Sequence, residues 1–230
     1  MPQRYNAWVS GGTQMNWRWG IVGLTCIALI GTGIIVRDQL NNRRYAKWAA
    51  EYRTLAERGG AKSQWALGAM YEYGKGVPKD YGEALRWYRK SAEQRDAKGE
   101  YALALMYHEG KGLPQDDSES ARWCRKGAEH GNALAQDALG YIYWRGEGVP
   151  SDYSEAVHWY RKSAEQNYPR AQYDLGYMYY FGYGVPRDRV RAHDLFEQAA
   201  AQGDEDAKQA LYCYRKNISI DPGAGLRGLQ

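Results

Sequence analysis

The chain has 230 residues, 44% hydrophobic and 25% charged, which is the composition of a folded protein and argues against wholesale disorder. Its three cysteines are too few for a disulfide framework or a zinc ribbon. The net charge of +4 is concentrated before residue 61, whereas residues 61–204 carry 19 Lys/Arg and 21 Asp/Glu, so the body of the protein lacks the basic surface that nucleic-acid binding requires.

The first predicted element is a transmembrane helix over residues 17–36, which follows an N-terminal tail over residues 1–16. Residues 20–36 (GIVGLTCIALIGTGIIV) contain no charge, and Trp17 and Trp19 suit the headgroup zone at one end. About 20 residues at about 1.5 Å each match a hydrocarbon core of about 30 Å. A cleaved signal peptide is an alternative, but no A-x-A-like site follows the run closely. A buried core helix is another, but arginines would not flank it at both ends. The sequence favours a membrane anchor.

The charges that flank this segment predict its orientation. More positive side chains follow the apolar run than precede it: Arg37, Arg43, Arg44, Lys47 and Arg53 after it, against Arg4, Arg18 and the amino terminus before it. The positive-inside rule therefore favours a single-pass protein whose remaining chain is cytoplasmic. The first forty residues also resemble an uncleaved export signal, which would place the rest in the periplasm or a lumen instead.

From residue 61 the chain consists of consecutive 36-residue units without gaps, and each unit is predicted to form two helices. The units are 61–96, 97–132, 133–168 and 169–204. In the first helix a Leu recurs with a Tyr four residues later, which places both on one face. A Gly or Ala beside the Leu allows a neighbouring helix to approach closely. The recurring residues are Leu67, Leu103, Leu139 and Leu175 with Tyr71, Tyr107, Tyr143 and Tyr179 in the first helix, and Ala84, Ala156 and Ala192 with Trp87, Trp123 and Trp159 in the second.

The two helices of a unit are joined by the motif G-x-G-[VL]-P-x-D. Its first Gly suits a left-handed position that ends the first helix, and its Pro prevents the helix from continuing. Its Asp suits the N-cap of the second helix, and a Glu three residues later predicts a capping box, except in the last unit, which has Arg191 there. Asp96, Asn132 and Asp204 are predicted to cap the first helices, and Pro169 to occupy the first helical position after Tyr168.

The pattern A-x-x-x-L-G-x-x-Y-x-x-G-x-G-V-P-x-D-x-x-x-A-x-x-W resembles the Sel-one-like repeat (SLR), a relative of the tetratricopeptide repeat. The resemblance implies an all-α protein, a right-handed α-solenoid of helix-turn-helix SLR units preceded by the transmembrane helix. Residues 37–60 would form an N-terminal capping helix, residues 205–216 a C-terminal capping helix, and residues 217–230 a flexible tail.

The same resemblance implies a non-catalytic scaffold or adaptor, tethered to a membrane, that binds another protein or peptide in the concave groove of the solenoid. The alternative is a soluble exported SLR regulator of the cell envelope, released by signal cleavage. Some secreted SLR proteins with a cysteine pair in every repeat have been linked to penicillin hydrolysis, but this chain lacks those pairs. The resemblance therefore implies no enzymatic activity for this chain.

The residues themselves offer no catalytic, metal or cofactor site. The four histidines occupy four different repeat positions and share no metal-ligand spacing. Ser91 and Ser163 lack a paired His and Asp, and Cys124 replaces a core tyrosine of the other units. We therefore expect no catalytic residue, no metal and no cofactor.

The binding surface is predicted from the related tetratricopeptide solenoids, in which positions 2, 5, 9 and 12 of the first helix face the groove. These positions vary between units, while the Leu, Gly and Tyr framework does not. The predicted groove residues are Trp65, Tyr101, His108, Tyr141, Trp144, Arg170, Tyr173, Tyr177 and Tyr180. The alternative is that the aromatic residues pack against the adjacent second helix and belong to the core.

Overall fold

The computed structural model describes residues 42–216, 218 and 220, and within them the only regular secondary structure is helical. An N-terminal helix occupies residues 42–57. It is followed, in chain order, by α2 (Ala61–Tyr73), α3 (Tyr81–Glu93), α4 (Ala97–Glu109), α5 (Asp117–Glu129), α6 (Ala133–Arg145), α7 (Tyr153–Glu165), α8 (Pro169–Phe181), α9 (Arg189–Ala201) and α10 (Glu205–Arg215).

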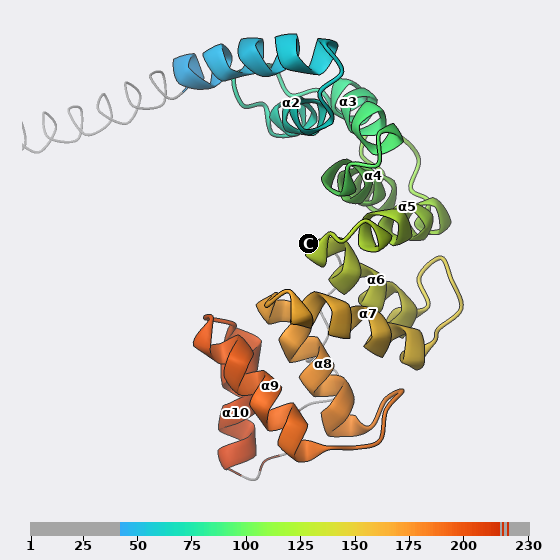
Figure 1. Ribbon diagram of the computed structural model, residues 1–230, viewed down its shortest axis with the longest axis vertical. Coiled ribbons are helices and arrows are strands. Elements are labelled where there is room, and N and C mark those ends of the chain that lie inside the picture. Colours follow the sequence, from blue (N-terminus) through green and yellow to red (C-terminus); the bar gives the residue numbers. More distant parts are fainter. Residues whose placement is uncertain (1–41, 217, 219, 221–230) are drawn as a thin grey trace, which may run out of the picture.

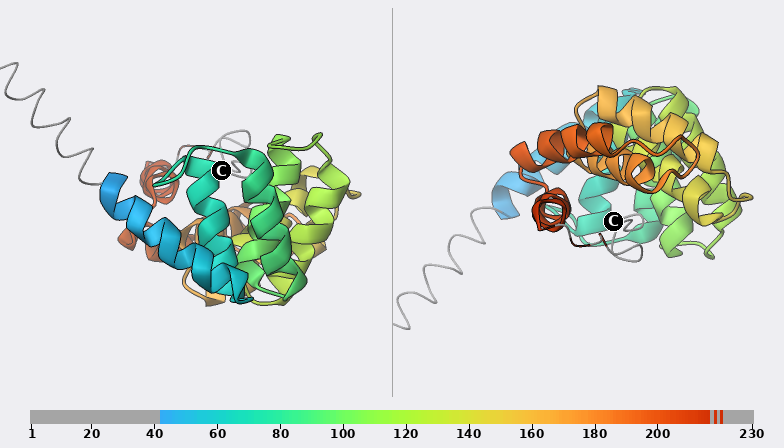
Figure 2. Two further views of the ribbon diagram at one scale, coloured as in Figure 1. Left: turned by 90° about the horizontal axis from the view of Figure 1, so that it is seen from above. Right: turned by 90° about the horizontal axis from the view of Figure 1, so that it is seen from below.

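The helices stack as a curved solenoid in which each unit contributes one antiparallel pair (Figure 1). The views from above and below show that the stack follows a superhelical curve (Figure 2). The first helices approach one another across units, because α2 contacts α4 and α4 contacts α6. These helices therefore line the inner, concave side of the curve, and the predicted α-solenoid is confirmed.

The turn between the two helices of a unit forms as predicted. Its first glycine ends the first helix in the left-handed region, with φ of 66° at Gly74 and 81° at Gly182. Its aspartate caps the second helix: Asp80 Oδ1 accepts from the Glu83 amide at 3.0 Å. The caps of the first helices are also confirmed, with Asn132 accepting from Ala135, and Pro169 begins α8.

The second half of the predicted capping box is wrong. Glu83 Oε2 accepts from the indole of Trp87 at 3.2 Å, within the same helix. The amide of Asp80, which a capping box would bind, donates to the Tyr71 carbonyl at 3.0 Å instead. This bond from the turn to the preceding helix leaves the glutamate free to hold the tryptophan of the second helix.

Within each unit the two helices meet where the glycine beside the conserved Leu faces an aromatic ring. A Cβ atom on Gly140 would lie 2.7 Å from the ring carbons of Tyr160, closer than carbon atoms approach. Gly68 faces Tyr88 and Gly176 faces Phe196 in the same way. The unit over residues 97–132 has the opposite arrangement, with Ala104 on the first helix and the smaller Cys124 on the second, both buried. A larger residue on the first helix therefore coincides with a smaller one on the second.

The two helices of a unit are also joined by a repeated amide pair. Gln94 donates to Gln64 at 2.7 Å, and the equivalent pairs follow in the last two units, Gln166 to Gln136 at 2.7 Å and Gln202 to Gln172 at 2.8 Å. The unit over residues 97–132 replaces this pair by His130 and the buried Glu100, 2.7 Å apart.

The two ends of the stack are closed by half units. The N-terminal helix takes the place of a second helix, because Ala56 is buried and its carbonyl accepts from Gln64 Nε2 at 3.0 Å. The predicted capping helix thus spans 42–57 in the described part of its range. At the other end α10 buries Leu211, as predicted.

Most of the predicted flexible tail, residues 217–230, lies outside the described residues. Ile218 and Ile220 are described, and the Ile218 amide donates to the Cys213 carbonyl at 2.9 Å. Ile220 is only 5% exposed and joins the main hydrophobic cluster. At this position the chain packs against the solenoid.

The predicted tail over residues 1–16 and the predicted transmembrane helix over residues 17–36 also lie outside the described residues. Across the range that the structure describes, none of the helices combines the length and the apolar character needed to cross a bilayer.

The contact between Gly140 and Tyr160 yields a stability test. Gly140→Ala gains about 1 kcal/mol of helix propensity, but overpacking against the ring costs about 1–3 kcal/mol, so we expect net destabilisation. Tyr160→Cys recreates the Ala–Cys pair of the second unit and is itself destabilising, because it opens a cavity, but Gly140→Ala should cost less in its presence than in the native chain. Denaturant unfolding of the full chain should show a coupling energy of at least about 1 kcal/mol between the two changes. Simple additivity would show that this contact does not set the helix spacing.

Candidate functional site

The concave face differs along its length, because its variable positions are filled differently in each unit. Six of the predicted groove residues are partly exposed on it: Trp65, Tyr101, His108, Tyr141, Trp144 and Arg170. The other three, in the last unit, are buried. The structure therefore divides the predicted groove into an open part and a packed part.

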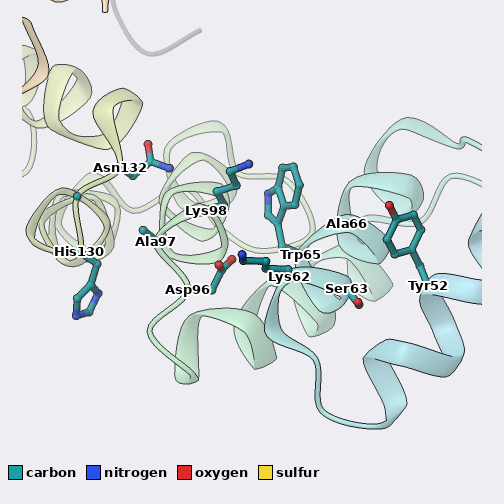
Figure 3. A pocket seen from close by; sticks show the side chains of 11 residues that line it. Tyr52, Lys62, Ser63, Trp65, Ala66, Asp96, Ala97, Lys98, His130 and Asn132 are labelled. Carbon is teal, nitrogen blue, oxygen red and sulfur yellow. The ribbon is translucent and has the colours of Figure 1, made fainter. Parts of the chain in front are cut away.

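The open part contains a cavity of about 490 Å³ at the N-terminal ends of α2, α4 and α6. Figure 3 shows Trp65 and Lys62 on α2 beside Lys98 on α4, with Tyr52 of the N-terminal helix on one side and His130 on the other. Its volume lies in the range of about 300–1,000 Å³ that is typical of ligand sites. We define this space as the Trp65 cavity.

The cavity combines an aromatic surface with cationic side chains. Lys98 Nζ lies 4.8 Å from the centre of the Trp65 ring, in a cation–π contact. Lys62 and Lys98 are exposed, and neither forms an ion pair with any described residue. His130 is already engaged by Glu100. The two lysine ammonium groups therefore remain available to a ligand.

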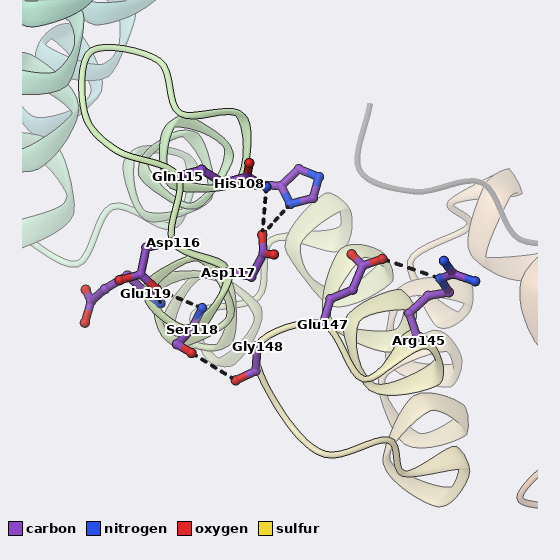
Figure 4. Close-up of polar contacts among 9 residues, drawn as sticks. All are labelled: His108, Gln115, Asp116, Asp117, Ser118, Glu119, Arg145, Glu147 and Gly148. Carbon is purple, nitrogen blue, oxygen red and sulfur yellow. Dashed lines mark hydrogen bonds and ion pairs between the residues drawn. The ribbon is translucent and has the colours of Figure 1, made fainter.

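The middle of the concave face is crossed by the protein's own polar pairs. His108 Nδ1 lies 3.1 Å from Asp117 Oδ1, as Figure 4 shows. Lys111 joins Glu72 of the preceding unit at 3.0 Å and also contacts Glu109. His108, a predicted groove residue, is thus half-buried and paired.

In the last unit the predicted groove tyrosines belong to the core, which corrects the sequence prediction. Tyr173, Tyr177 and Tyr180 are 3%, 1% and 5% exposed. The Tyr177 ring centre is 4.7 Å from that of Phe181, and the Phe181 ring stacks on Tyr183 at 5.6 Å. Aromatic residues from the end of α8 and from the turn therefore fill the space that a ligand would need.

A buried acidic pair lies beside this aromatic cluster. Asp174 is 1% exposed, and its Oδ2 accepts from Arg170 Nε at 3.1 Å. Oδ1 of Asp174, Oδ1 of Asp137 and the hydroxyl of Tyr160 are buried and have no hydrogen-bond partner among the described residues. Burial raises the pKa of Asp137 to about 7, opposed by the charge of Arg170. Burial and the charge of Asp137 raise the pKa of Asp174 well above its ordinary value.

Residues with nucleophilic potential are used in packing. Ser91 Oγ donates to the Ala61 carbonyl at 2.9 Å, and Ser163 Oγ to the Ala133 carbonyl at 2.8 Å. Cys124 is buried, and burial raises the pKa of its thiol, so little of it is thiolate. Among the described residues, His193, Asp194 and Glu197 bring possible metal ligands within 4.8 Å of one another. They lie on the outer surface of α9, are largely exposed and have no buried ligand, so we assign no metal site there.

Sequence reasoning found Trp65 but missed most of its surroundings. Lys62 and Lys98 occupy position 2 of their units, which is a groove position, and their shared positive charge was the available signal. Tyr52 and Asn132 come from the capping helix and from a junction between units, where the repeat pattern predicts no ligand contact.

Comparison with known proteins agrees with the repeat pattern. The Sel1 repeat model matches residues 61–96, 97–132, 133–168 and 169–204. A protective antigen present in uropathogenic Escherichia coli strains, displaying an SLR fold, is 36% identical, with a TM-score of 0.70 over 77% of this chain and 39% of that chain. A Sel1 repeat protein from Oxalobacter formigenes is also 36% identical, with a TM-score of 0.69 over 74% of this chain and 49% of that chain. This chain thus spans less than half the length of either. No curated protein matches it.

The buried acidic pair predicts that stability falls as the pH rises. The folded state holds the Asp137 proton up to a pKa of about 7, whereas the unfolded chain releases it near its ordinary value of about 4. The stabilisation is therefore present at acidic pH and is lost through this window, at up to about 1.4 kcal/mol per pH unit. Asp137→Asn should reduce this slope in melting curves recorded between about pH 5 and pH 8. A melting temperature that rises over this range would contradict the assignment.

Proposed function

Because this chain belongs to the Sel1 repeat family, we propose that it is a non-catalytic adaptor that binds another protein or peptide on the concave face of its solenoid. Sel1 repeat proteins are generally protein-interaction scaffolds. Stacked helix pairs present an extended curved surface that suits this role.

One observation carries the proposal. Framework residues such as Leu67 and Leu139 are fully buried, whereas the variable positions in the first three units remain at least partly exposed. Three of these variable residues, Lys62, Trp65 and Lys98, line the Trp65 cavity at one end. Packing therefore accounts for the residues that repeat. We attribute the accessible aromatic ring and the two accessible lysines of the cavity to ligand binding.

We further propose that residues 17–36 tether this adaptor to a membrane, with the repeats on the cytoplasmic side. The uncharged run of residues 20–36 and the excess of Lys/Arg after it support this. A tether would hold the captured protein at the membrane surface, where a short linker raises its effective concentration.

The adaptor role is tested by capture of crosslinked partners with the full chain. Trp65→Ala combined with Tyr141→Ala removes two partly exposed aromatic side chains from the concave face. We expect capture to fall at least about thirtyfold, because central aromatic residues contribute about 2 kcal/mol or more in interfaces. Tyr73→Ala with Tyr212→Ala removes two exposed tyrosines outside the predicted groove positions and should leave capture unchanged. Equal loss in both variants, or none in either, would contradict a concave binding face.

The tether is tested separately by fractionation. The full chain should stay in the membrane pellet after a carbonate wash, whereas deletion of residues 17–36 should release it. A cysteine placed after Asn217 should resist an impermeant maleimide in intact cells. Release of the full chain by carbonate would favour the soluble exported protein, and rapid labelling would reverse the proposed orientation.

A further inference from the structure

The Trp65 cavity is rich in hydrogen-bond donors that have no acceptor. Lys62 and Lys98 each carry an ammonium group without an ion-pair partner among the described residues. In the described part of the chain no acceptor for the Trp65 indole N–H is found either, although Trp87 and Trp159 on the second helices each donate to a glutamate. The cavity thus offers positive charge and N–H groups.

Three acceptor atoms that line the same cavity are already used. Asp96 Oδ2 accepts from the Gly99 amide at 3.0 Å and lies 2.9 Å from Ser91 Oγ, whose single proton it shares with the Ala61 carbonyl. Asn132 Oδ1 accepts from the Ala135 amide at 3.0 Å. The carbonyl of Gly131 accepts from Gln166 Nε2 at 3.2 Å. A ligand therefore meets unsatisfied donors but few free acceptors, which selects an anionic, acceptor-rich group.

We propose that the Trp65 cavity binds an acidic segment of the partner protein, with carboxylates on Lys62 and Lys98 and an apolar side chain against the Trp65 ring. This inference rests on the proposed adaptor function and specifies its partner. Lys98 already lies over the ring, so a carboxylate that pairs with Lys98 brings its neighbouring side chain within reach of Trp65. Burial on the indole then supplies affinity, while the lysines supply selectivity for acidic sequences.

The charge distribution favours a short acidic segment over a polyanion. Nucleic acids and anionic membranes are bound by extended basic surfaces, and residues 61–204 carry two more acidic than basic side chains. The positive charge at the cavity is local, and the buried Glu100 lies just behind it, paired with His130. One or two carboxylates match such a site, whereas a long phosphate backbone would meet the acidic residues around it.

The probe is a phage-displayed library of random peptides, selected against the purified full chain and against two charge-reversed variants. Lys62→Glu with Lys98→Glu reverses the charge of the two lysines that line the cavity. Lys90→Glu with Lys162→Glu is the matched control, because these exposed lysines lie over Trp87 and Trp159 at 4.7 and 4.6 Å, on second helices away from the cavity. Circular dichroism checks that both variants are folded.

We expect the full chain and the control variant to enrich peptides that combine Asp or Glu with a large apolar residue. The cavity variant should bind these peptides at least about tenfold more weakly, and binding to the full chain should weaken as salt is added. Enrichment without an acidic bias, or acidic peptides that bind all three proteins equally, would overturn this inference and leave the adaptor role intact. Binding of DNA or of phosphatidylserine vesicles that the cavity variant alone loses would reassign the site to a polyanion. If no peptide is enriched and capture of partners does not depend on the concave face, both proposals fail.

Discussion

The distance between the two helices of a unit is set by a small residue on the first helix facing a side chain on the second. Gly68, Gly140 and Gly176 lie so close to an aromatic ring that a Cβ atom would clash. The second unit reaches similar packing with Ala104 against the smaller Cys124. Because interiors are close-packed, this contact leaves little freedom in helix spacing. The amide pairs within the units then recur at 2.7–2.8 Å along the stack.

A framework that repeats in this way frees the concave positions to differ between units. At one end they form a cavity with open lysines, in the middle His108 is paired with Asp117 while Tyr141 and Trp144 stay partly exposed, and in the last unit the three tyrosines are packed into the core. The Trp65 cavity lies at the N-terminal end of the solenoid, close in sequence to the segment that we propose as a tether. A partner bound there would lie near the membrane.

Local signals in the sequence were sufficient for the repeat, its helices and its turns. The glycine that ends α2, the proline that follows and the aspartate that caps α3 each act through bonds to residues a few positions away. Such bonds do not depend on the rest of the fold, so the motif predicted them correctly. The 36-residue period predicted the stacking, because a helix pair buries its apolar face only against another pair. Those features, together with the family, were determined by the sequence alone.

Tertiary structure decided which of the variable residues are open. Periodicity places Trp65 at position 5 and Tyr177 at position 9 of their units, both groove positions, yet Tyr177 is buried and Trp65 lines a cavity. The difference arises from neighbouring residues that the repeat pattern does not specify. Phe181 and Tyr183 pack against the Tyr177 ring. Lys98 of the next unit contacts the Trp65 ring and leaves it accessible from the cavity. The glutamate of the predicted capping box likewise binds Trp87, because the amide it would have capped is taken by the preceding helix. Burial and partner choice depend on side chains brought together from separate units, and a repeat pattern read one unit at a time does not contain those distances.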